Sequence, residues 1–205
     1  MASFWRIKPM KKIKKIITCE ILSFQELTTI EKRLIERAVL VRHNAQSPYS
    51  HFWVGCSIVT DPKNFSDGCN VENANWSETV HAEENAISNA ISKYGPCRIK
   101  AVAIVGAPEE QEVAWPPTKQ LSSPAKSKIK NIGDICSPCG HCLQVIAENC
   151  FDQKGLFDPT VPILSYNRVN GLTYRTTIGD AYPMPFLPQH LGVNYAKDPR
   201  IKKYK

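Results

Sequence analysis

Three cysteines in the stretch ICSPCGHCLQV, Cys136, Cys139 and Cys142, are separated by two residues each time. Thiols at this spacing serve either as zinc ligands or as disulfide partners. Pro138 is suited to the first position of a helix, so Cys139 and Cys142 would stand near a helix N-terminus with both thiols on one face. A helix N-terminus stabilises the thiolate, which is the form that binds a metal. The stretch therefore predicts part of a metal site.

A second motif, His81-Ala82-Glu83, stands at the predicted start of another helix. If the two helix N-termini are adjacent, His81 completes a site of one histidine and two cysteines, and the fourth position of a tetrahedral zinc ion stays open for water. Glu83 would then lie beside that water as a general acid and base, not as a ligand. Either motif alone is weak, because cysteine pairs also serve structural zinc sites and most helical histidines are solvated. Together they indicate a catalytic metal centre.

Helices and strands predicted from the hydrophobic pattern would hold these motifs in place. Residues 29–46 have apolar side chains at helical spacing, whereas residues 52–60 are apolar and rich in β-branched residues, as in a buried strand. The remaining predicted elements are a turn over 61–68, a strand over 69–73, a helix over 77–95, a strand over 99–105, a helix from Cys136, and strands over 161–167 and 172–178 that pair around Asn170 and Gly171. This order predicts the α/β fold class, with a mixed sheet covered by helices.

The distribution of charge does not favour a basic body that binds nucleic acid. The 205 residues carry a formal net charge of +7, but residues 1–15 hold six Lys or Arg and no acid, and residues 195–205 hold five against one Asp. The two ends together carry +10, so the residues between them carry −3. We expect a basic N-terminal extension over 1–28, one domain over 29–193 with an inserted loop at about 107–133, and a basic C-terminal tail over 194–205.

We also expect a cytoplasmic protein that does not span a membrane. No apolar run is long enough for a transmembrane helix, and the first residues lack the charged start, long apolar stretch and cleavage site of a signal peptide. Eight cysteines are scattered along the chain. That distribution is more typical of a reducing compartment, with free or metal-bound thiols, than of a disulfide framework.

Four motifs, in order, resemble the cytidine deaminase family that acts on nucleosides. They are PYSHFWVG at 48–55, GCNVENANW at 68–76, HAE at 81–83 and SPCGHCLQV at 137–145. The last two match the H-x-E and P-C-x-x-C signature of zinc-dependent deaminases. The resemblance implies a three-layer α/β/α sandwich with a mixed five-stranded sheet, one Zn²⁺ per subunit, and a homo-oligomer that is a tetramer or, alternatively, a dimer. It also implies hydrolytic deamination of cytidine and 2′-deoxycytidine to uridine and 2′-deoxyuridine with release of ammonia, as in pyrimidine salvage.

Carried over to this sequence, the metal motifs imply that His81, Cys139 and Cys142 bind zinc and that Glu83 transfers protons. This set of ligands resembles one of two variants in the family. Many other members have three cysteines at the metal and an arginine directly after the motif glutamate. Two thiolates and a neutral histidine give a zinc site of zero net charge. Glu84 stands at the position of that arginine. With no excess negative charge at the metal, no arginine is required there.

The resemblance also implies a substrate site. Asn70 and Glu72 would bind the ribose 3′-hydroxyl, Phe52 would pack on the pyrimidine, and the backbones of Ala82 and Ser137 would contact the base. On pattern alone, Asn70 also fits a turn, Glu72 a solvated strand and Phe52 the hydrophobic core. A carboxylate at Glu72 would repel a phosphate on the 3′-oxygen, so we expect a free nucleoside as partner rather than nucleic acid.

Departures from the family pattern leave two alternatives open. The segment between Glu83 and Pro138 is longer than in the family, Leu143 replaces an arginine, and Leu191 takes the place of a C-terminal aromatic residue. One alternative is a deaminase for a nucleotide, a modified nucleoside or a cytosine in nucleic acid. The other is a zinc-containing protein that binds nucleic acid through its basic tails and has no turnover, in which Cys136 could be a third thiol ligand.

Overall fold

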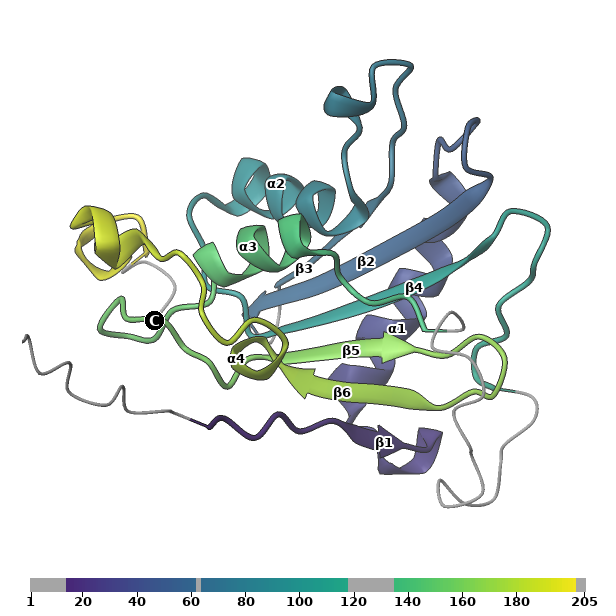
Figure 1. Cartoon of the computed structure of the whole chain (residues 1–205), viewed down its shortest axis with the longest axis horizontal. Helices are drawn as coiled ribbons and strands as arrows, with labels where there is room; N and C mark the ends of the chain where they lie inside the picture. The colour runs from purple at the N-terminus through teal and green to yellow at the C-terminus, as the bar shows by residue number, and fades with distance from the viewer. Residues whose placement is uncertain (1–13, 62–63, 118–134, 202–205) are drawn as a thin grey trace, which may run out of the picture.

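A six-stranded mixed sheet forms the centre of the molecule (Figure 1). The computed structural model describes residues 14–61, 64–117 and 135–201. The strands are β1 (Glu20–Leu22), β2 (Phe52–Asp61), β3 (Asn64–Cys69), β4 (Ala101–Pro108), β5 (Pro162–Tyr166) and β6 (Thr173–Thr177). Their spatial order is β1-β6-β5-β4-β2-β3, and β4 with β5 is the parallel pair among these antiparallel neighbours. The α/β class with a mixed sheet is confirmed, whereas the expected number of five strands is wrong.

Helices cover both faces of the sheet. α1 (Thr29–Val41) lies on one face, and α2 (Ala82–Tyr94) and α3 (Gly140–Glu148) lie side by side on the other (Figure 1). The short α4 (Ile178–Ala181) follows β6 directly. Single 3-10 turns are found at Phe24–Glu26, Arg42–Asn44, Trp76–Glu78, Pro188–Leu191 and Tyr195–Lys197. The expected three-layer α/β/α sandwich is therefore confirmed.

The central strand β4 is buried on both faces and separates two hydrophobic cores. Val102 and Ile104 lie in the core beneath α2 and α3, whereas Ala103 and Val105 lie in the core beneath α1. Successive side chains of a strand point to opposite faces of the sheet. Because both faces are covered by helices, this strand has a continuous apolar run in the sequence instead of an alternating pattern.

The sixth strand, β1, comes from the N-terminal extension that the sequence places outside the domain. It pairs antiparallel with β6, with Glu20 opposite Arg175. The Arg175 Nε atom donates to the Glu20 carboxylate at 2.7 Å, and the Thr18 hydroxyl donates to Asp180 at 2.8 Å. This part of the extension therefore belongs to the sheet. Most of the basic residues expected in the extension fall in residues 1–13, which lie outside the described residues.

The hairpin of β2 and β3 differs from the prediction in its turn and in its second strand. β3 already includes most of the polar residues that the sequence assigns to a turn over 61–68, and it contains only the first residue of the strand predicted over 69–73. The polar side chains are accommodated because partners on two helices meet them. Ser66 Oγ donates to a backbone oxygen of α2 at 2.8 Å, and Asp67 accepts from Arg37 of α1 at 2.6 Å.

The start of α3 also differs from the prediction. Cys139 is the N-cap residue and Gly140 the first residue of the helix, so Pro138 precedes the helix and is not its first residue. The Cys139 N-cap has an extended backbone, with φ of −75° and ψ of 172°. Both cysteines of the metal motif nevertheless stand at the N-terminus of α3, as the spacing predicts.

The expected insertion and C-terminal tail are described in part. β4 extends into the insertion as far as Pro108, and residues 118–134 lie outside the described residues. Tyr195, at the start of the expected tail, stacks on Phe151 and donates to Glu148 at 2.7 Å, so this part of the tail packs against the domain. None of the helices in the described part of the chain has the length and apolar character needed to cross a membrane.

Candidate active site

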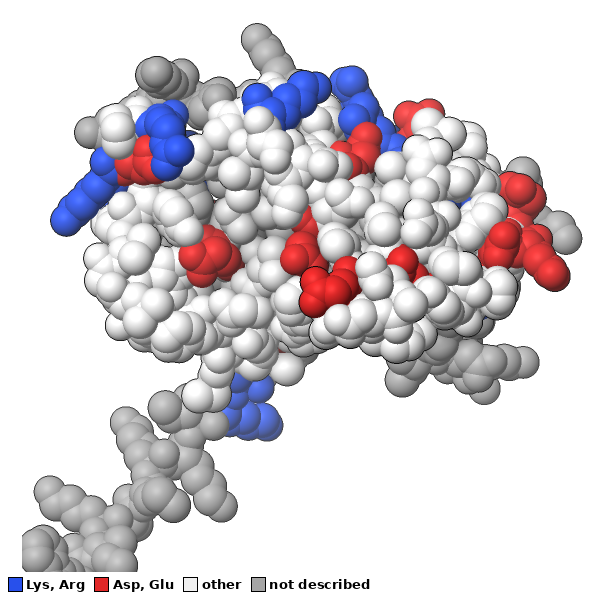
Figure 2. All heavy atoms as spheres, turned by 90° about the horizontal axis from the view of Figure 1, so that it is seen from above, with Lys and Arg blue, Asp and Glu red and all other residues white. Residues whose placement is uncertain are grey.

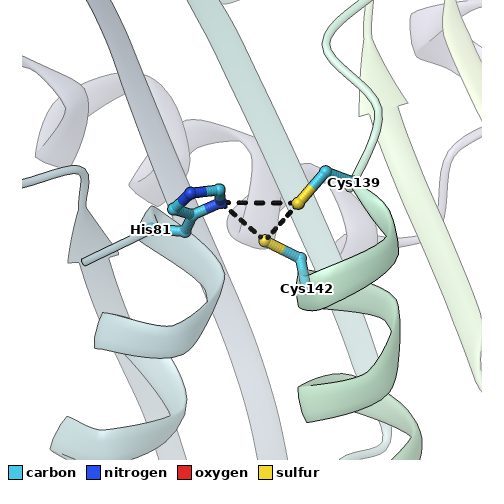
Figure 3. Close-up of side chains that lie close together, drawn as sticks. All are labelled: His81, Cys139 and Cys142. Atoms are coloured by element: carbon cyan, nitrogen blue, oxygen red, sulfur yellow. Dashed lines mark hydrogen bonds between the residues drawn. The ribbon is translucent and has the colours of Figure 1, made fainter. Parts of the chain in front are cut away.

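Three side chains from two helix N-termini converge in one cluster (Figure 3). His81 is the N-cap residue of α2, Cys139 is the N-cap residue of α3, and Cys142 lies in the first turn of α3. The His81 Nδ1 atom lies 3.2 Å from Cys142 Sγ and 3.5 Å from Cys139 Sγ, and the two sulfurs are 3.6 Å apart. Within the described ranges this is the one group of His, Cys, Asp or Glu side chains arranged to hold a metal ion.

The three ligand atoms are spaced as a tetrahedral zinc ion requires. Zinc bonds of about 2.0 Å to nitrogen and about 2.3 Å to sulfur imply about 3.5 Å between nitrogen and sulfur and about 3.8 Å between two sulfurs. The observed separations agree with these values to within about 0.3 Å. The cluster therefore fits a zinc ion with three protein ligands, which is the number typical of catalytic zinc sites.

The surroundings of Cys142 disfavour a free thiolate. Burial raises the pKa of Cys142, and the nearby Glu83 carboxylate and Cys139 raise it further. A bound divalent cation reverses this balance, because a thiol that coordinates zinc is deprotonated. The donor set therefore fits a cation chemically as well as geometrically.

Two consecutive glutamates in the first turn of α2 have different surroundings. Glu83 is buried, with 5% of its surface exposed, and it lines the cavity beside the cluster. The Glu84 Oε2 atom lies 3.4 Å from Nε2 of His141 in α3, and the His141 ring makes an edge contact with the ring of His81. Glu83 is thus the carboxylate inside the site, while Glu84 connects the two helices at its outer side.

A cavity of about 250 Å³ opens beside the cluster. Its volume lies just below the range of about 300–1,000 Å³ that is typical of small-molecule sites. Eight of the nine site residues predicted from the sequence line it: Asn70, Glu72, His81, Ala82, Glu83, Ser137, Cys139 and Cys142. Val54, Trp76, Thr79 and Cys136 also line it and are not among the predicted residues. Val54 and Trp76 belong to the PYSHFWVG and GCNVENANW motifs, which were the signal that could have identified them.

Phe52, the ninth predicted residue, is not among the described residues that line the cavity. It packs with Cys136 around Gly106, where an added Cβ atom would lie 2.8 Å from the Phe52 ring and 2.7 Å from the Cβ atom of Cys136. Phe52 is partly buried and belongs to neither hydrophobic core, so its expected contact with the pyrimidine stays a prediction. Cys136 is outside the metal cluster. Burial, assisted by the Glu83 carboxylate, raises the pKa of Cys136 to about 12, so its thiol is neutral.

Asn70 is held in the cavity wall by the backbone of β2. Its Oδ1 atom accepts from the Val54 amide at 2.9 Å, and its Nδ2 atom donates to the Phe52 carbonyl at 3.0 Å. The Asn70 side chain thus replaces ladder hydrogen bonds at the start of the strand. An amide nitrogen carries two hydrogens, so Nδ2 keeps a second donor for a ligand.

Glu72 is held by a turn that precedes β2. Its Oε2 atom accepts from the backbone amides of Tyr49 and Ser50 at 3.0 and 3.1 Å. Burial raises the pKa of Glu72, but the hydrogen bonds from Ser50 and Tyr49 outweigh burial and hold that pKa below its usual range. Glu72 is therefore ionised at neutral pH, with both backbone amides on one of its two oxygens.

The face of the molecule above α2 and α3 is mostly uncharged (Figure 2). Acidic side chains are scattered across its middle, and Lys and Arg side chains lie towards its margins. The residues that line the cavity, as far as the chain is described, include no Lys or Arg. Among the described residues, neither the cavity lining nor the middle of this face has the clustered basic groups that bind a phosphate backbone.

A His/Cys/Cys cluster at two helix N-termini, with a buried glutamate beside it, defines the site of a zinc-dependent deaminase. Residues 28–154 match the family described as "Cytidine and deoxycytidylate deaminase zinc-binding region", which is more than half of the chain. The chain therefore belongs to the cytidine and deoxycytidylate deaminase family of zinc-dependent hydrolases.

Individual relatives agree with this family. A cytidine deaminase from Sporosarcina psychrophila is 30% identical over 160 residues, which cover 78% of this chain and 93% of the relative. The crystal structure of cytidine deaminase from Burkholderia pseudomallei is 30% identical with a TM-score of 0.55, and the match covers 78% of this chain and 100% of that chain. Cytidine deaminase from Mycobacterium tuberculosis is 25% identical with a TM-score of 0.51, covering 75% of this chain and 94% of that chain.

Proposed function

We propose that this chain hydrolyses cytidine and 2′-deoxycytidine to uridine and 2′-deoxyuridine and releases ammonia. The observation that carries the proposal is one small cavity, lined by the His/Cys/Cys cluster, by the buried Glu83, and by Asn70 and Glu72. Metal ligands, a group for proton transfer and groups for a sugar are the parts that this reaction needs.

His81, Cys139 and Cys142 would hold one Zn²⁺ per chain, since their ligand atoms have tetrahedral spacing. Zinc in such a site activates water as a nucleophile at neutral pH. His81 would bind through Nδ1, the ring nitrogen that faces both sulfurs. The contact between the His81 and His141 rings supports the orientation that this requires.

Glu83 would move the protons of the reaction. Its carboxylate takes a proton from the attacking water and delivers it to ring N3 while the oxygen adds to C4. Glu83 then takes the remaining proton from the C4 hydroxyl and passes it to the exocyclic amine. The C4–N bond breaks, ammonia leaves, and C4 keeps its oxygen as the carbonyl of the product. One water is consumed and one ammonia released, so the cytosine ring becomes uracil. The burial of Glu83 keeps these transfers away from bulk water.

Asn70 and Glu72 would bind the sugar, and the backbones of Ala82 and Ser137, which both line the cavity, would contact the base. An ionised Glu72 accepts a hydrogen bond from a sugar hydroxyl and repels a phosphate. With Glu72 and Glu83 in a lining that contains no Lys or Arg among the described residues, the cavity favours a neutral ligand. We therefore propose free nucleosides as substrates rather than nucleotides or polynucleotides.

The proposal extends to pyrimidine salvage in the cytoplasm by a homo-oligomer. All eight cysteines are free thiols, which supports a reducing compartment. Exposed apolar side chains near the C-terminal end, among them Phe186, Leu191 and Val193, support contact with another subunit. A tetramer is proposed, with a dimer as the alternative, and the mass in solution from light scattering distinguishes the two.

Turnover by the purified, zinc-loaded chain tests the proposal. We expect the absorbance of cytidine to fall as uridine forms. Glu83→Gln should keep zinc and lose turnover, because the amide cannot accept or deliver the proton. Glu84→Gln is the matched control, since it changes the adjacent carboxylate, and it should keep both zinc and most of the turnover.

A substrate panel separates the alternatives. Cytidine and 2′-deoxycytidine should both react faster than their 5′-monophosphates, and the opposite order would contradict the nucleoside assignment. A zinc-loaded chain with no turnover on any of the four would contradict the nucleoside assignment and leave a modified nucleoside, a cytosine in nucleic acid or the non-catalytic alternative. For the non-catalytic alternative, nucleic-acid affinity should disappear when residues 1–13 and 202–205 are removed, because these segments hold most of the basic residues of the two ends.

A further inference from the structure

His51 has a backbone conformation that is unusual for its residue type. Its φ angle is +53°, and it is the one non-glycine residue with a positive φ in the described part of the chain. The left-handed region is uncommon for a residue with a side chain, although Asn, Asp and His enter it more readily than most. Such an outlier persists where the surrounding structure requires it.

On its N-terminal side, His51 closes the turn that holds Glu72. The His51 amide donates to the Ser47 carbonyl at 3.0 Å, which completes one helical turn. The amides of Tyr49 and Ser50 lie inside this turn, and both donate to Glu72 Oε2. The position of the Glu72 carboxylate thus depends on the shape of the turn that ends at His51.

On its C-terminal side, His51 starts the strand that holds Asn70. Phe52 is the first residue of β2 and accepts from Asn70 Nδ2, and the Val54 amide donates to Asn70 Oδ1. The backbones of Asn70 and Glu72 both bond Gln46, but the Asn70 side chain is fixed to the chain after His51 and the Glu72 carboxylate to the chain before it. His51 is the junction between the two residues to which the proposed function assigns the sugar.

The backbone, rather than the imidazole, holds His51 in place. The Glu109 amide donates to the His51 carbonyl at 2.8 Å. The side chains of the same two residues also approach, with Nδ1 3.1 Å from Oε2, but they are 68% and 45% exposed. Pairs as exposed as this contribute little to stability. The conformation should therefore survive loss of the imidazole if the new residue can adopt a positive φ.

We propose that the left-handed backbone of His51 is a positioning element that determines discrimination for the 3′-hydroxyl of the nucleoside. It sets the relative placement of the Asn70 amide and the Glu72 carboxylate, so a residue that resists a positive φ separates these two groups. The inference rests on the proposed role of Asn70 and Glu72 in binding the sugar. It concerns the backbone of His51, which contacts neither the metal cluster nor the reacting atoms.

The test compares kcat/KM for cytidine and for 3′-deoxycytidine, which lacks only the 3′-hydroxyl. The quantity of interest is kcat/KM for cytidine divided by kcat/KM for 3′-deoxycytidine. His51→Asn and His51→Gly adopt a positive φ readily and should keep this ratio within about threefold of its value in the parent chain. His51→Val is β-branched and should lower the ratio about tenfold or more, which corresponds to the loss of one charge-assisted hydrogen bond. The loss should fall on cytidine, with 3′-deoxycytidine almost unaffected. His51→Ala should give an intermediate ratio and serves if the valine variant does not fold.

Three results would overturn the inference. The ratio could stay unchanged in His51→Val and His51→Ala; both substrates could slow equally; or the asparagine and glycine variants could lose the ratio as fully as valine, which would implicate the imidazole. Zinc content and the melting temperature of each variant show that the comparison is made on intact enzyme.

Glu72→Gln distinguishes failure of the sugar assignment from failure of the role given to His51. If it leaves the ratio unchanged, the sugar assignment fails, whereas if it collapses the ratio and His51→Val does not, only the role of His51 fails.

Discussion

The Nδ1 atom of His81 lies 3.2 Å from the Sγ atom of Cys142, although 61 positions of the chain separate the two residues. Each stands at the N-terminus of a helix, and the two helices pack side by side on the same face of the sheet. The contact therefore requires α2 to lie close to the sheet and α3 to lie close to α2. We therefore expect a substitution that displaces either helix to affect stability and metal binding together.

The geometry of the cluster predicts which cysteine substitutions remove zinc from the chain. Cys139→Ser should lower the zinc content of the purified chain from about one per chain towards zero, because one of three protein ligands is replaced by a hydroxyl that is a weak ligand. Cys136→Ser is the matched control, since it changes a cysteine three positions away that lines the same cavity. It should keep its zinc. Metal analysis after dialysis gives the answer, and equal zinc loss in both variants would mean that Cys136 is a ligand.

Gly68 in β3 allows α2 to approach the sheet. A Cβ atom at this position would overlap the backbone nitrogen of Ala86 and lie 2.6 Å from the carbonyl oxygen of Ala82, both in α2. We expect Gly68→Ala to lower the free energy of unfolding by about 1–3 kcal/mol, as overpacking does, and to weaken zinc retention because α2 carries His81. Denaturant unfolding with metal analysis measures both effects.

Gly140 provides the control for Gly68. It is the first residue of α3, and a Cβ atom added there meets no atom within 4 Å. Gly140→Ala should raise the free energy of unfolding by about 0.4–1 kcal/mol, because alanine restricts the unfolded chain. A loss of stability in this variant as large as in Gly68→Ala would contradict the steric explanation.

Glu31 predicts part of the pH dependence of stability. Burial raises the pKa of Glu31, but hydrogen bonds from Thr28 and Arg175 outweigh burial, and the pKa lies below its usual value. A folded-state pKa below the unfolded value of about 4.3 means that ionised Glu31 stabilises the fold above that pH, and that this contribution is lost as the pH falls through the folded pKa. Glu31→Gln keeps the capping geometry and removes the charge.

We therefore expect Glu31→Gln to lower the free energy of unfolding by about 1–2 kcal/mol at pH 7, with a difference from the parent chain that shrinks below about pH 4. Urea unfolding at pH 7, 5 and 3.5 measures the difference directly. Glu36→Gln, on the exposed side of the same helix, should show little change at any of these values. A difference for Glu31→Gln that stays constant with pH would refute the assignment.

The pairing of β1 with β6 predicts that shortening the N-terminus lowers stability only when the deletion reaches β1. A chain that begins at Lys14 keeps the contact of Thr18 with Asp180 and the pairing of β1 with β6. A chain that begins at Ser23 loses both and leaves the edge of β6 unpaired. We expect the longer deletion to cost about 2 kcal/mol, or roughly 4–8 °C in Tm, and to increase self-association through the open edge. Calorimetry and sedimentation compare the two chains, and identical behaviour would show that β1 contributes nothing.

Local sequence patterns predicted the helices and strands whose apolar side chains recur at helix or strand spacing. The helical spacing before Pro48 corresponds to α1, and the β-branched run after it corresponds to β2. The two runs on either side of Gly171 are β5 and β6, with Gly171 at a φ of +71° in the turn between them. In each of these elements the apolar pattern follows from burial of one face or both.

The elements that were missed lack such a pattern. β1 has three residues, too few for any periodicity, and its place in the sheet depends on Arg175 and the free edge of β6. β3 contains Ser66 and Asp67, which are typical of turns and are compatible with a strand because helices supply their partners. In both cases the deciding contacts come from segments far away in the chain.

The sequence by itself determined which chemical groups the site contains and that they stand at two helix starts, because H-x-E and P-C-x-x-C are local spacings that act through helix geometry. Only the tertiary structure decided that Nδ1 of His81 faces the sulfurs, that Cys136 stays out of the cluster, and that Phe52 packs against Gly106 instead of lining the cavity. It also decided that a single turn ending at a left-handed His51 holds Glu72. These outcomes depend on side-chain directions and on distances between remote segments, which residue type and spacing do not specify.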